Sequence, residues 1–479
     1  MRFLHPQRDA QLELSLDDVF LLPQLHPGGS RLDVDLTPPD RPGSSQPLVS
    51  ANMNAVTGKR MAETMARYGG LGVLPQDMAI RTVERIVRHV KQAPLRCDTA
   101  LTISPDATLR DVRGILYKRA HGMVVVVDDD QHPMGLVTAS DMRDVDQYTP
   151  VSQVMSRRPV TVSQARSHAA TFDLMDERRL KAVPIVDGDG RLRGVLTRDD
   201  AVRFALFTPS LGAAGRLMVS AAVGISSDAA ERAAALKDMG VDVIVLDTAH
   251  GHQRRMLEAI AEVRDATGPS HTLVAGNVCT AEGTRALIEA GADIVKVNVG
   301  PGAMCTTRMK TGVGRPTFTA ALACAEEAKR HGRFIWADGG VRNPRDVALY
   351  LAAGAARVML GTILAGTYES PGEMKTDEHG RYKENYGMAS ARAVRDRSAD
   401  LRPFEQAKKA LFREGISTSR VYLKPGLESV GATVTEIVTG VQSAFTYVGA
   451  RDCESFAETA IVGVQSPAGY TEGKPRPVY

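Results

Sequence analysis

The feature that most constrains the fold is a series of short apolar runs that alternate with stretches of helical periodicity. Eight such runs are present, six of them after residue 210. They cover residues 46–53, 70–74, 217–224, 241–251, 271–278, 292–302, 334–341 and 356–364. Helical stretches separate the later runs, at 228–239, 281–290 and 320–331. Short buried strands that alternate with helices are typical of βα units, and eight of them predict a parallel α/β barrel.

The barrel pattern is interrupted between residues 95 and 210, where the chain repeats itself. MVVVVD at 123–128 is followed by GLVTASD at 135–141, and VPIVD at 183–187 is followed by GVLTRDD at 194–200. Each copy therefore has two strand-like runs and a Gly-Φ-Φ-Thr-x-x-Asp turn. This internal repeat predicts two small α/β modules. We predict that residues 1–94 and 211–479 form the two parts of a catalytic barrel and that 95–210 form a regulatory insert.

The repeated turn resembles that of tandem cystathionine-β-synthase (CBS) domains. In such pairs, the threonine and aspartate often hold the ribose and phosphate of an adenine or guanine nucleotide. The matching positions here are Thr138, Asp141, Thr197 and Asp200. The resemblance therefore implies a site for ATP or GTP in the insert. These residues are also expected to cap the helix that follows, which is compatible with ligand binding.

Composition and charge exclude several other classes of protein. With 59 Lys and Arg against 56 Asp and Glu, the net charge is +3, and no long basic run indicates a specific nucleic-acid partner. No apolar run is long enough to span a membrane, and the N-terminus has no signal-like core, so a cytoplasmic location is expected. The five cysteines are scattered without a CxxC pair, which argues against a disulfide framework or a zinc site.

The sharpest motif follows the apolar run that ends near residue 300. Residues 300–314 read GPGAMCTTRMKTGVG. Four glycines and a proline in this segment predict a loop rather than a helix, and glycines let a backbone approach a ligand closely. A cysteine in such a loop, here Cys305, is a candidate exposed thiolate nucleophile. The alternative, a structural cysteine in a flexible loop, is disfavoured by the surrounding motif.

This segment resembles the catalytic loop of the IMP dehydrogenase/GMP reductase family, whose hallmark is GxGxxCTTR. Further segments resemble motifs of the same family in the same order. They are LDDVFLLP at 16–23, DTAHGH at 247–252, AGNV at 275–278, ADGGV at 337–341, GT at 361–362, YGMAS at 386–390 and EG at 414–415. The resemblance covers nearly the whole chain outside the insert. It implies a TIM (β/α)8 barrel and a purine-nucleotide oxidoreductase.

The resemblance also assigns roles to individual residues. The catalytic residues that it implies are Cys305, Thr307 and Glu414. The substrate-binding residues are Asp338, Gly340, Gly361, Thr362, Tyr386, Gly387, Met388 and Asn277. Asp247 and Thr248 would hold the nicotinamide cofactor, and backbone carbonyls of Gly300, Gly302 and Cys305 would hold a monovalent cation such as K⁺. An ionised Asp338 accepts hydrogen bonds only, which suits a pair of ribose hydroxyls.

One position departs from the family pattern. The family commonly has a serine two residues before the cysteine, where it contributes to phosphate binding. This chain has Ala303 there. The loss of one hydroxyl contact would cost roughly 0.5–1.5 kcal/mol if nothing replaces it.

The two branches of the family differ in how they resolve the covalent cysteine–purine intermediate. An IMP dehydrogenase hydrolyses it with an Arg-Tyr pair on a mobile flap, whereas a GMP reductase expels ammonia. No tyrosine occurs between residues 388 and 421, so the pair is absent. The ANM at 51–53 and KTGVG at 310–314 also resemble reductases, although the insert and the segment 247–252 look more like a dehydrogenase.

We therefore predict an NADPH-dependent GMP reductase of purine salvage that converts GMP to IMP and ammonia and is regulated by ATP or GTP at the insert. The first alternative is an NAD-dependent IMP dehydrogenase that makes XMP. The second is a catalytically silent nucleotide sensor. Members of the family are tetramers or octamers, so self-association is expected.

Overall fold

The structure is a computed structural model that describes residues 2–3, 12–25, 28–40, 43–387 and 419–475, and the single positions 402, 404, 408 and 416. Its centre is a closed barrel of eight parallel strands, so the predicted TIM barrel is confirmed. Each of the eight apolar runs contributes one strand. In barrel order these are β12 (Ser220–Val223), β13 (Val243–Asp247), β14 (Thr272–Val278), β15 (Ile294–Val297), β16 (Phe334–Asp338), β17 (Arg357–Leu360), β3 (Leu48–Ser50) and β4 (Leu71–Leu74).

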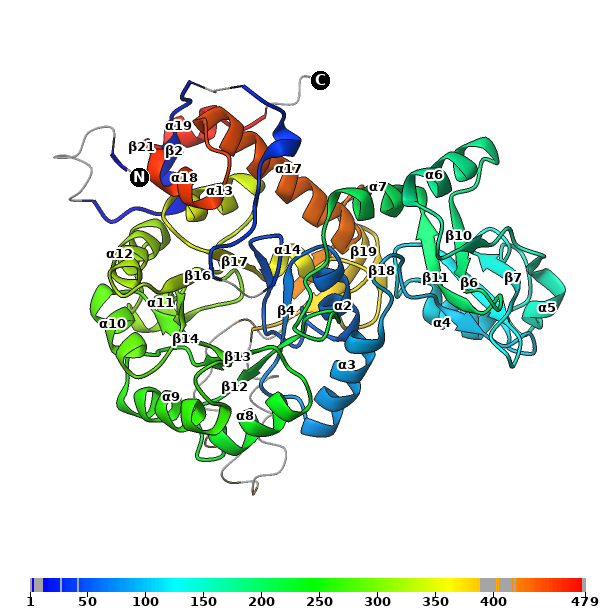
Figure 1. Ribbon diagram of the computed structural model, residues 1–479, viewed down its shortest axis with the longest axis horizontal. Helices are drawn as coiled ribbons and strands as arrows, with labels where there is room; N and C mark the ends of the chain where they lie inside the picture. Colours follow the sequence, from blue (N-terminus) through cyan, green and yellow to red (C-terminus); the bar gives the residue numbers. More distant parts are fainter. Residues whose placement is uncertain are drawn as a thin grey trace.

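Helices surround this barrel and enclose its strands (Figure 1). They are α2 (Lys59–Arg67), α3 (Ile80–Gln92), α8 (Ala229–Asp238), α9 (Arg254–Thr267), α10 (Ala281–Glu289), α12 (Thr317–Arg330), α13 (Pro344–Ala352), α14 (Thr362–Ala365) and α17 (Val430–Val448). The main hydrophobic core lies between these helices and the strands. A second cluster, which includes Val245 and Trp336, fills the inside of the barrel. The barrel is therefore a packed scaffold with its functional groups confined to its ends.

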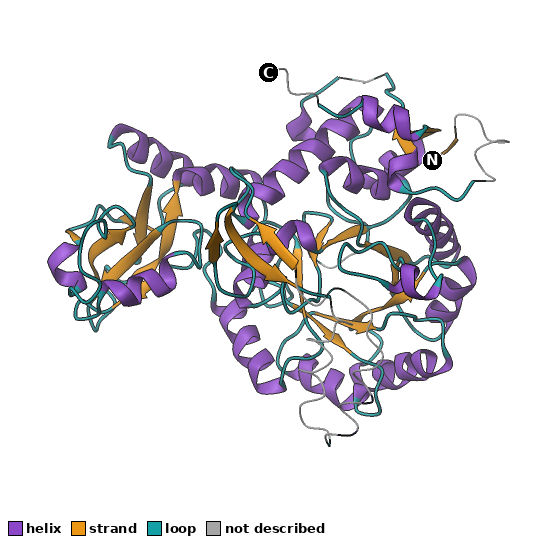
Figure 2. Ribbon diagram, turned by 180° about the vertical axis from the view of Figure 1, so that it is seen from behind, coloured by secondary structure: helices purple, strands orange, loops and turns teal. Residues whose placement is uncertain are grey.

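The insert interrupts the chain without interrupting the barrel. Strands β4 and β12 lie on either side of the insert in sequence, yet they pair directly, with Ser220 opposite Val73. In Figures 1 and 2 the insert lies beside the barrel as a separate body with its own strands. Because the sheet closes across the insertion point, the barrel does not need the insert to complete its hydrogen bonding.

Both halves of the sequence repeat form the same small unit. In each, a buried strand pairs antiparallel with the strand that ends in the Thr-x-x-Asp turn. The strands of the insert are β5 (Thr102–Ile103), β6 (Met123–Val127), β7 (Pro133–Thr138), β8 (Ser156–Arg157), β9 (Val162–Ser163), β10 (Ala182–Val186) and β11 (Leu192–Thr197). Its helices are α4 (Leu109–Leu116), α5 (Val151–Val154), α6 (His168–Glu177) and α7 (Arg198–Leu206). The domain limits at 94/95 and 210/211 and the identity of a CBS pair stay predictions.

A buried ionic network joins the insert to the barrel. Arg119 of the insert contacts Glu63 of α2 at 2.6 Å and Asp98 at 2.7 Å, and Arg67 of α2 contacts the same aspartate at 2.9 Å. Burial disfavours the charge on Glu63, yet Arg119 and Arg67 hold the pKa of its carboxyl well below the usual range. Removal of one partner of such a buried pair leaves an uncompensated buried charge, which is energetically costly. The network therefore opposes separation of the insert from the barrel.

The two ends of the chain pack together over α13 and α17. Strands β1 (Arg2–Phe3) and β2 (Val19–Leu21) flank β21 (Ile461–Val464), next to α18 (Cys453–Thr459) and α19 (Pro467–Glu472). The C-terminal segment thus contains a strand and a short helix. A further sheet is formed by β18 (Lys375–Asp377), β19 (Gly380–Asn385) and β20 (Ser419–Tyr422). Two 3-10 turns, η1 (Leu16–Asp18) and η2 (Arg31–Asp33), complete the described elements.

Two local predictions were wrong. The predicted loop at 300–314 contains a short helix, α11 (Thr307–Thr311), because these five residues include no glycine or proline and the left-handed Gly312 ends the helix only after them. No helix follows Thr138, where residues 139–145 form turns. Asp144 adopts a positive φ of 58°, which a continuing helix does not allow.

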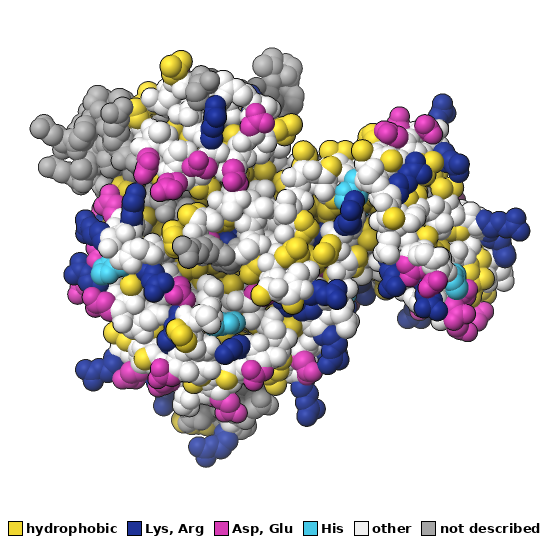
Figure 3. Space-filling view, viewed as in Figure 1, with side chains coloured by type: hydrophobic (Ala, Val, Ile, Leu, Met, Phe, Trp, Pro, Cys, Tyr) yellow, Lys and Arg dark blue, Asp and Glu magenta, His cyan; other side chains and the backbone are white. Residues whose placement is uncertain are grey.

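Among the described residues, no helix has the length and apolarity to cross a membrane. On the face shown in Figure 3, cationic and anionic side chains are interspersed over both the barrel and the insert.

Candidate active site

A cavity of about 830 Å³ opens at the carboxyl ends of the barrel strands. Four successive strands, β13 to β16, each contribute one polar side chain to its wall. These are Asp247, Asn277, Lys296 and Asp338. Parallel strands bring their carboxyl ends to the same edge, so residues distant in sequence meet here.

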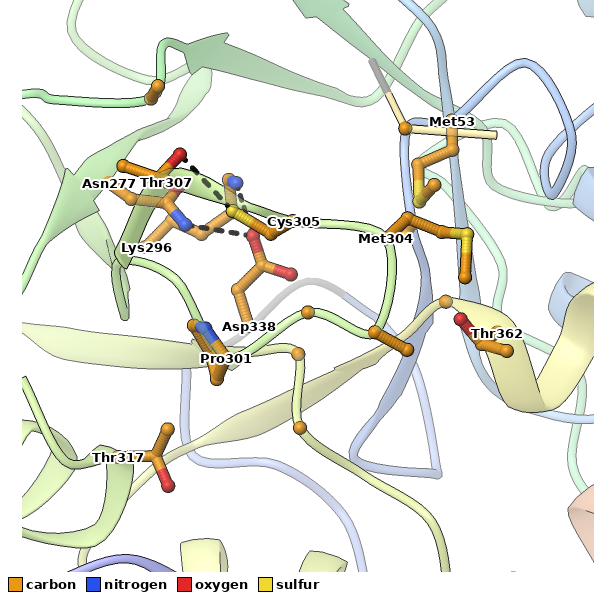
Figure 4. A pocket seen from close by; sticks show the side chains of 18 of the residues that line it. Met53, Asn277, Lys296, Pro301, Met304, Cys305, Thr307, Thr317, Asp338 and Thr362 are labelled. Carbon is orange, nitrogen blue, oxygen red and sulfur yellow. Dashed lines mark hydrogen bonds and ion pairs between the residues drawn. The ribbon is translucent and has the colours of Figure 1, made fainter. Parts of the chain in front are cut away.

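Lys296 lies between the two carboxylates of this wall. Its Nζ is 2.8 Å from Asp247 and 2.6 Å from Asp338, and the lysine side chain is 3% exposed. Burial by itself would lower the pKa of the ammonium group, but the two carboxylates outweigh it and raise the pKa above the ordinary lysine value. The lysine therefore remains charged and holds both carboxylates in place. Figure 4 shows its contact with Asp338.

Two asparagines fix the carboxylates from other directions. Asn52 donates to Asp247 at 2.9 Å, and Asn277 donates to Asp338 at 2.9 Å. Within the described chain the carbonyl oxygen of Asn277 is buried and accepts no hydrogen bond. A buried acceptor without a partner in the cavity wall is suited to a donor group of a ligand.

Cys305 lies on the loop that follows β15, and its Sγ is 3.3 Å from the hydroxyl of Thr307. Figure 4 shows this pair close to the contact between Lys296 and Asp338. Of the five cysteines, all of them described, Cys305 alone is exposed. Burial raises the pKa of Cys97, Cys324 and Cys453 to about 12, which leaves those thiols inert. Exposure in the cavity is the property that a thiol nucleophile needs.

Another part of the cavity wall is built from glycines and backbone. Gly339 and Gly340 have φ values of +84° and +80°, which other residues rarely adopt. A Cβ atom at Gly340 would lie 3.4 Å from Pro301 of the catalytic loop, so the two segments approach each other closely. Gly361 and Thr362 complete this side, and Figure 4 shows Thr362 facing Met304. Such a wall presents backbone amides to an anion such as phosphate.

A short backbone ladder ties the catalytic loop to the segment after β19. The amide of Gly387 donates to the carbonyl of Ile416, and the amide of Ile416 donates to the carbonyl of Met304, each at 3.0 Å. Gly387 and Met304 both line the cavity. Gly387 and Ile416 are therefore both anchored by backbone hydrogen bonds at the edge of the site.

Most of the residues expected at the site from the sequence line this one cavity. They are Cys305, Thr307, Asp338, Gly340, Gly361, Thr362, Gly387, Asn277, Asp247, Thr248 and Gly302. Tyr386, half-buried directly after β19, and Gly300 are not among the lining residues. Met388 and Glu414 lie outside the described residues.

The four residues of the insert that are expected to bind a nucleotide do not line this cavity. Asp141 accepts hydrogen bonds at 2.8 Å from the amide and the hydroxyl of Thr138. Thr197 caps α7, since its hydroxyl accepts from the amide of Asp200 at 3.0 Å. Asp200 is buried and accepts a hydrogen bond at 2.6 Å from Tyr68 of the barrel. In this state Asp200 links the insert to the barrel.

The sequence interpretation missed Lys296 and gave Asn52 no role at the site. A detectable signal existed for Lys296, because it stands alone in the apolar strand IVKV. A lysine buried in a barrel strand requires an anionic partner.

The carboxylates fit two ribose-bearing ligands. Asp247 and Asp338 are acceptor groups at separate strand ends, and a ribose offers two hydroxyl donors. The residues present thus suit two ligands that each carry a ribose, one at Asp338 and one at Asp247. A monovalent cation would require carbonyl oxygens of the catalytic loop, and that of Gly302 already accepts the amide of Cys305 at 2.9 Å.

Known proteins and a family model are similar to this chain over nearly its whole length. The model of the IMP dehydrogenase / GMP reductase domain matches residues 13–476. GMP reductases of Mycobacterium tuberculosis and Mycobacterium bovis are 49% identical over 480 residues, covering 100% of this chain and 99% of theirs. The inosine-5'-monophosphate dehydrogenase of Bacillus subtilis is 38% identical over 474 residues, covering 97% and 96%.

A solved structure is also similar to this chain over nearly its whole length. The crystal structure of a GMP reductase cysteine-to-alanine variant from Trypanosoma brucei, in complex with guanosine 5'-monophosphate, has a TM-score of 0.70 and 33% identity, covering 98% of both chains. Matches of this extent include the insert as well as the barrel. The chain belongs to the IMP dehydrogenase/GMP reductase family.

Proposed function

We propose that the protein is a GMP reductase that converts GMP to IMP and ammonia with NADPH. The observation that carries this proposal is the exposed Cys305 thiol beside Thr307, in the wall of a cavity that also holds Asp338. The relatives of 49% identity that match the whole chain are named GMP reductases. The absence of tyrosine between 388 and 421 agrees, since the dehydrogenase reaction needs a group that activates water.

In this proposal the substrate lies across the cavity from Asp338 to the glycine wall. Asp338, oriented by Lys296 and Asn277, accepts hydrogen bonds from the ribose hydroxyls. The backbone at Gly340, Gly361 and Thr362 receives the phosphate, with Tyr386, Gly387 and Met388 closing over phosphate and base. Ala303 supplies no hydroxyl, so the phosphate site relies on backbone amides.

Cys305 adds its thiolate to C2 of GMP, and the bond from C2 to the amino group then breaks. Thr307 and Glu414 relay the proton with which the amino group leaves as ammonia. Asp247 and Thr248 would hold the ribose of NADPH, which when bound would supply the hydride for C2. The bond between C2 and Cys305 then breaks, which returns the thiolate and releases IMP. Carbonyls of Gly300, Gly302 and Cys305 would hold a monovalent cation that orders the loop.

The insert is proposed as a regulatory CBS pair that binds ATP or GTP at Thr138, Asp141, Thr197 and Asp200. Regulation would act through tetramers or octamers, in a purine salvage enzyme of the cytoplasm. The contact between Asp200 and Tyr68 supports a link from this site to the barrel, because a ligand that competes for Asp200 would release Tyr68.

The test is the near-ultraviolet absorbance of the reduced nicotinamide, measured with GMP plus NADPH and with IMP plus NAD. A decrease with GMP supports the reductase. An increase with IMP would favour an IMP dehydrogenase, the function of relatives that are 38% identical. No change in either direction, with a folded protein, would favour a nucleotide sensor without catalytic activity.

A further inference from the structure

A second cavity, of about 610 Å³, lies where the insert joins the barrel. One wall is the linker 92–97, which follows α3 as the chain leaves the barrel. Another wall comes from the second module of the insert, around the segment between β9 and α6 and the start of β11. Arg216, on the segment that returns to the barrel, completes it. The cavity therefore contacts both chain crossings between barrel and insert.

The ionisable side chains around this cavity are almost all basic. They are Arg96, Arg166, His168, Arg193 and Arg216, and none of the described lining residues is acidic. The one other ionisable lining residue is Cys97, which is buried, and burial raises its pKa to about 12, so it carries no charge.

Only one of the four arginines has a carboxylate partner in the described chain. Arg193 pairs with Asp187 at 2.7 Å, outside the cavity lining. Arg96, Arg166 and Arg216 are exposed and show no ion pair within the residues that the structure describes. Three guanidinium groups without a described carboxylate partner, on the rim of a cavity that has no acidic lining residue, create a positive potential that attracts an anion. The charge balance of this cavity thus favours a multiply charged anion.

The cavity is not the predicted nucleotide site of the insert. In the second module, Thr197 pairs with Ala182 at one end of the sheet, whereas Leu192 and Ser163 both pair with Val186 at the other end. Ser163 and Leu192 line the cavity, and Thr197 and Asp200 do not. The cavity extends along β11 from Leu192 to Leu196 but does not include Thr197 or Asp200, so the two sites are lined by different residues.

We propose that this cavity binds the oligophosphate chain of a small molecule and thereby ties the linker 92–97 to the second module. The planar, forked guanidinium group matches phosphate oxygens in pairs, and several such groups select a chain of phosphates over a single one. The volume lies within the usual range for small-molecule sites, about 300–1,000 Å³. The phosphate chain is that of a nucleoside triphosphate or of inorganic polyphosphate, and the proposal does not depend on the reaction catalysed by the barrel.

The experiment is calorimetric titration of the full-length protein with inorganic tripolyphosphate and, separately, with ATP. The variant is R166Q/R216Q, with R178Q as the matched control. Arg178 is an exposed arginine of the same module that lines neither cavity. Wild type should bind, and the double variant should bind at least about 100-fold more weakly, since each charge-assisted hydrogen bond contributes about ten-fold. The control should be unchanged.

The two ligands separate the two sources. An equal loss for ATP and tripolyphosphate supports a nucleoside triphosphate, and a loss for tripolyphosphate alone supports an inorganic or other non-nucleoside chain. Hydrogen exchange in 92–98 should slow with tripolyphosphate in wild type only. The proposal is overturned if wild type binds neither ligand, if R166Q/R216Q binds like wild type, or if R178Q loses as much affinity. Because Arg166 and Arg216 are exposed, the variants should fold, which circular dichroism and the single variants R166Q and R216Q check.

Discussion

At the residue scale, the site depends on one lysine that serves two carboxylates. Asp247 and Asp338 both contact the Nζ of Lys296, so a single buried charge offsets two opposite charges. Without it, the two carboxylates at the ends of β13 and β16 would repel each other and rotate away. The proposed substrate and cofactor positions are thus coupled through a residue that need not touch either ligand.

We expect Lys296→Met to raise the KM for GMP and the KM for NADPH together, each by about ten-fold, because both carboxylates lose their charged partner. The measurement is steady-state kinetics with each substrate varied in turn. Lys329→Met is the control, since Lys329 is 78% exposed on the outer helix α12. An increase in only one of the two KM values would show that Lys296 supports one carboxylate alone.

The nucleophile makes a separate prediction. Cys305→Ala should lower turnover at least about 1,000-fold and leave GMP binding intact, because in the proposed mechanism the thiol forms the bond to the purine, whereas Asp338 and the glycine wall hold the nucleotide. Turnover is followed by nicotinamide absorbance and binding by calorimetry. Cys279→Ala, at a half-buried cysteine, should keep activity. Residual turnover near that of wild type in Cys305→Ala would remove the nucleophile assignment.

The sequence predicted Cys305, Asp338 and Asp247 because each belongs to a motif with a recognisable order of residues. It did not predict Lys296, since a lone lysine in an apolar strand reveals its role only when the neighbouring strands are placed. It also did not predict that the carboxylate of Asp200 contacts Tyr68 of the barrel, while the assignment of Asp200 to a nucleotide stays a prediction. Pairings between distant segments depend on the closed barrel and the docked insert, and no local pattern encodes them.

At the element scale, helix α17 begins against a buried acid. The carboxylate of Glu369 accepts a hydrogen bond from the amide of Val430, the first residue of α17, at 3.0 Å. Burial raises the pKa of Glu369 to about 7, and the hydrogen bond from Val430 only partly opposes this shift. The folded protein therefore binds this proton more tightly than the unfolded chain does. The resulting stability is full below the ordinary glutamic acid pKa and is lost as the pH rises through about 7.

Glu369→Gln should remove this pH dependence while its amide oxygen still accepts from Val430. Between about pH 5 and about pH 8, the free energy of unfolding should fall by about 3 kcal/mol less in the variant than in wild type. Urea unfolding at both pH values measures the difference. Glu373→Gln, at an exposed glutamate nearby, should follow wild type. Identical pH profiles for Glu369→Gln and wild type would show that Glu369 does not titrate in this range.

The elements themselves were largely predictable, because period and apolarity are local properties. All eight strands lie within the predicted apolar runs, and α8 and α10 lie within predicted helical stretches. The failures occurred where one residue decides the backbone. Gly312 permits α11 to form before it ends the helix, and the positive φ of Asp144 prevents a helix after Thr138.

At the scale of the whole molecule, the insert and the catalytic cavity are separate. No described residue between 95 and 210 lines the cavity, and β4 pairs with β12 without the insert. An isolated bridge places Asp98 beside Val195, so the chain enters and leaves the two modules at adjacent points. Excision of 99–194 with a short Gly/Ser turn is therefore compatible with the barrel and retains α7, whose Phe204 stacks on Tyr68.

We expect this excised protein to reduce GMP with kcat/KM within about ten-fold of wild type, since no described residue of the excised segment lines the catalytic cavity. Its stability should fall by about 3 kcal/mol or more, because Glu63 loses its partner Arg119. ATP and GTP should no longer change its activity, which is measured by nicotinamide absorbance with and without each nucleotide. Arg119→Leu in the full chain separates the loss of folding stability from the loss of nucleotide response. This variant should be less stable than wild type, but ATP and GTP should still change its activity. A folded excised protein without turnover would mean that the insert takes part in catalysis or in an assembly on which catalysis depends.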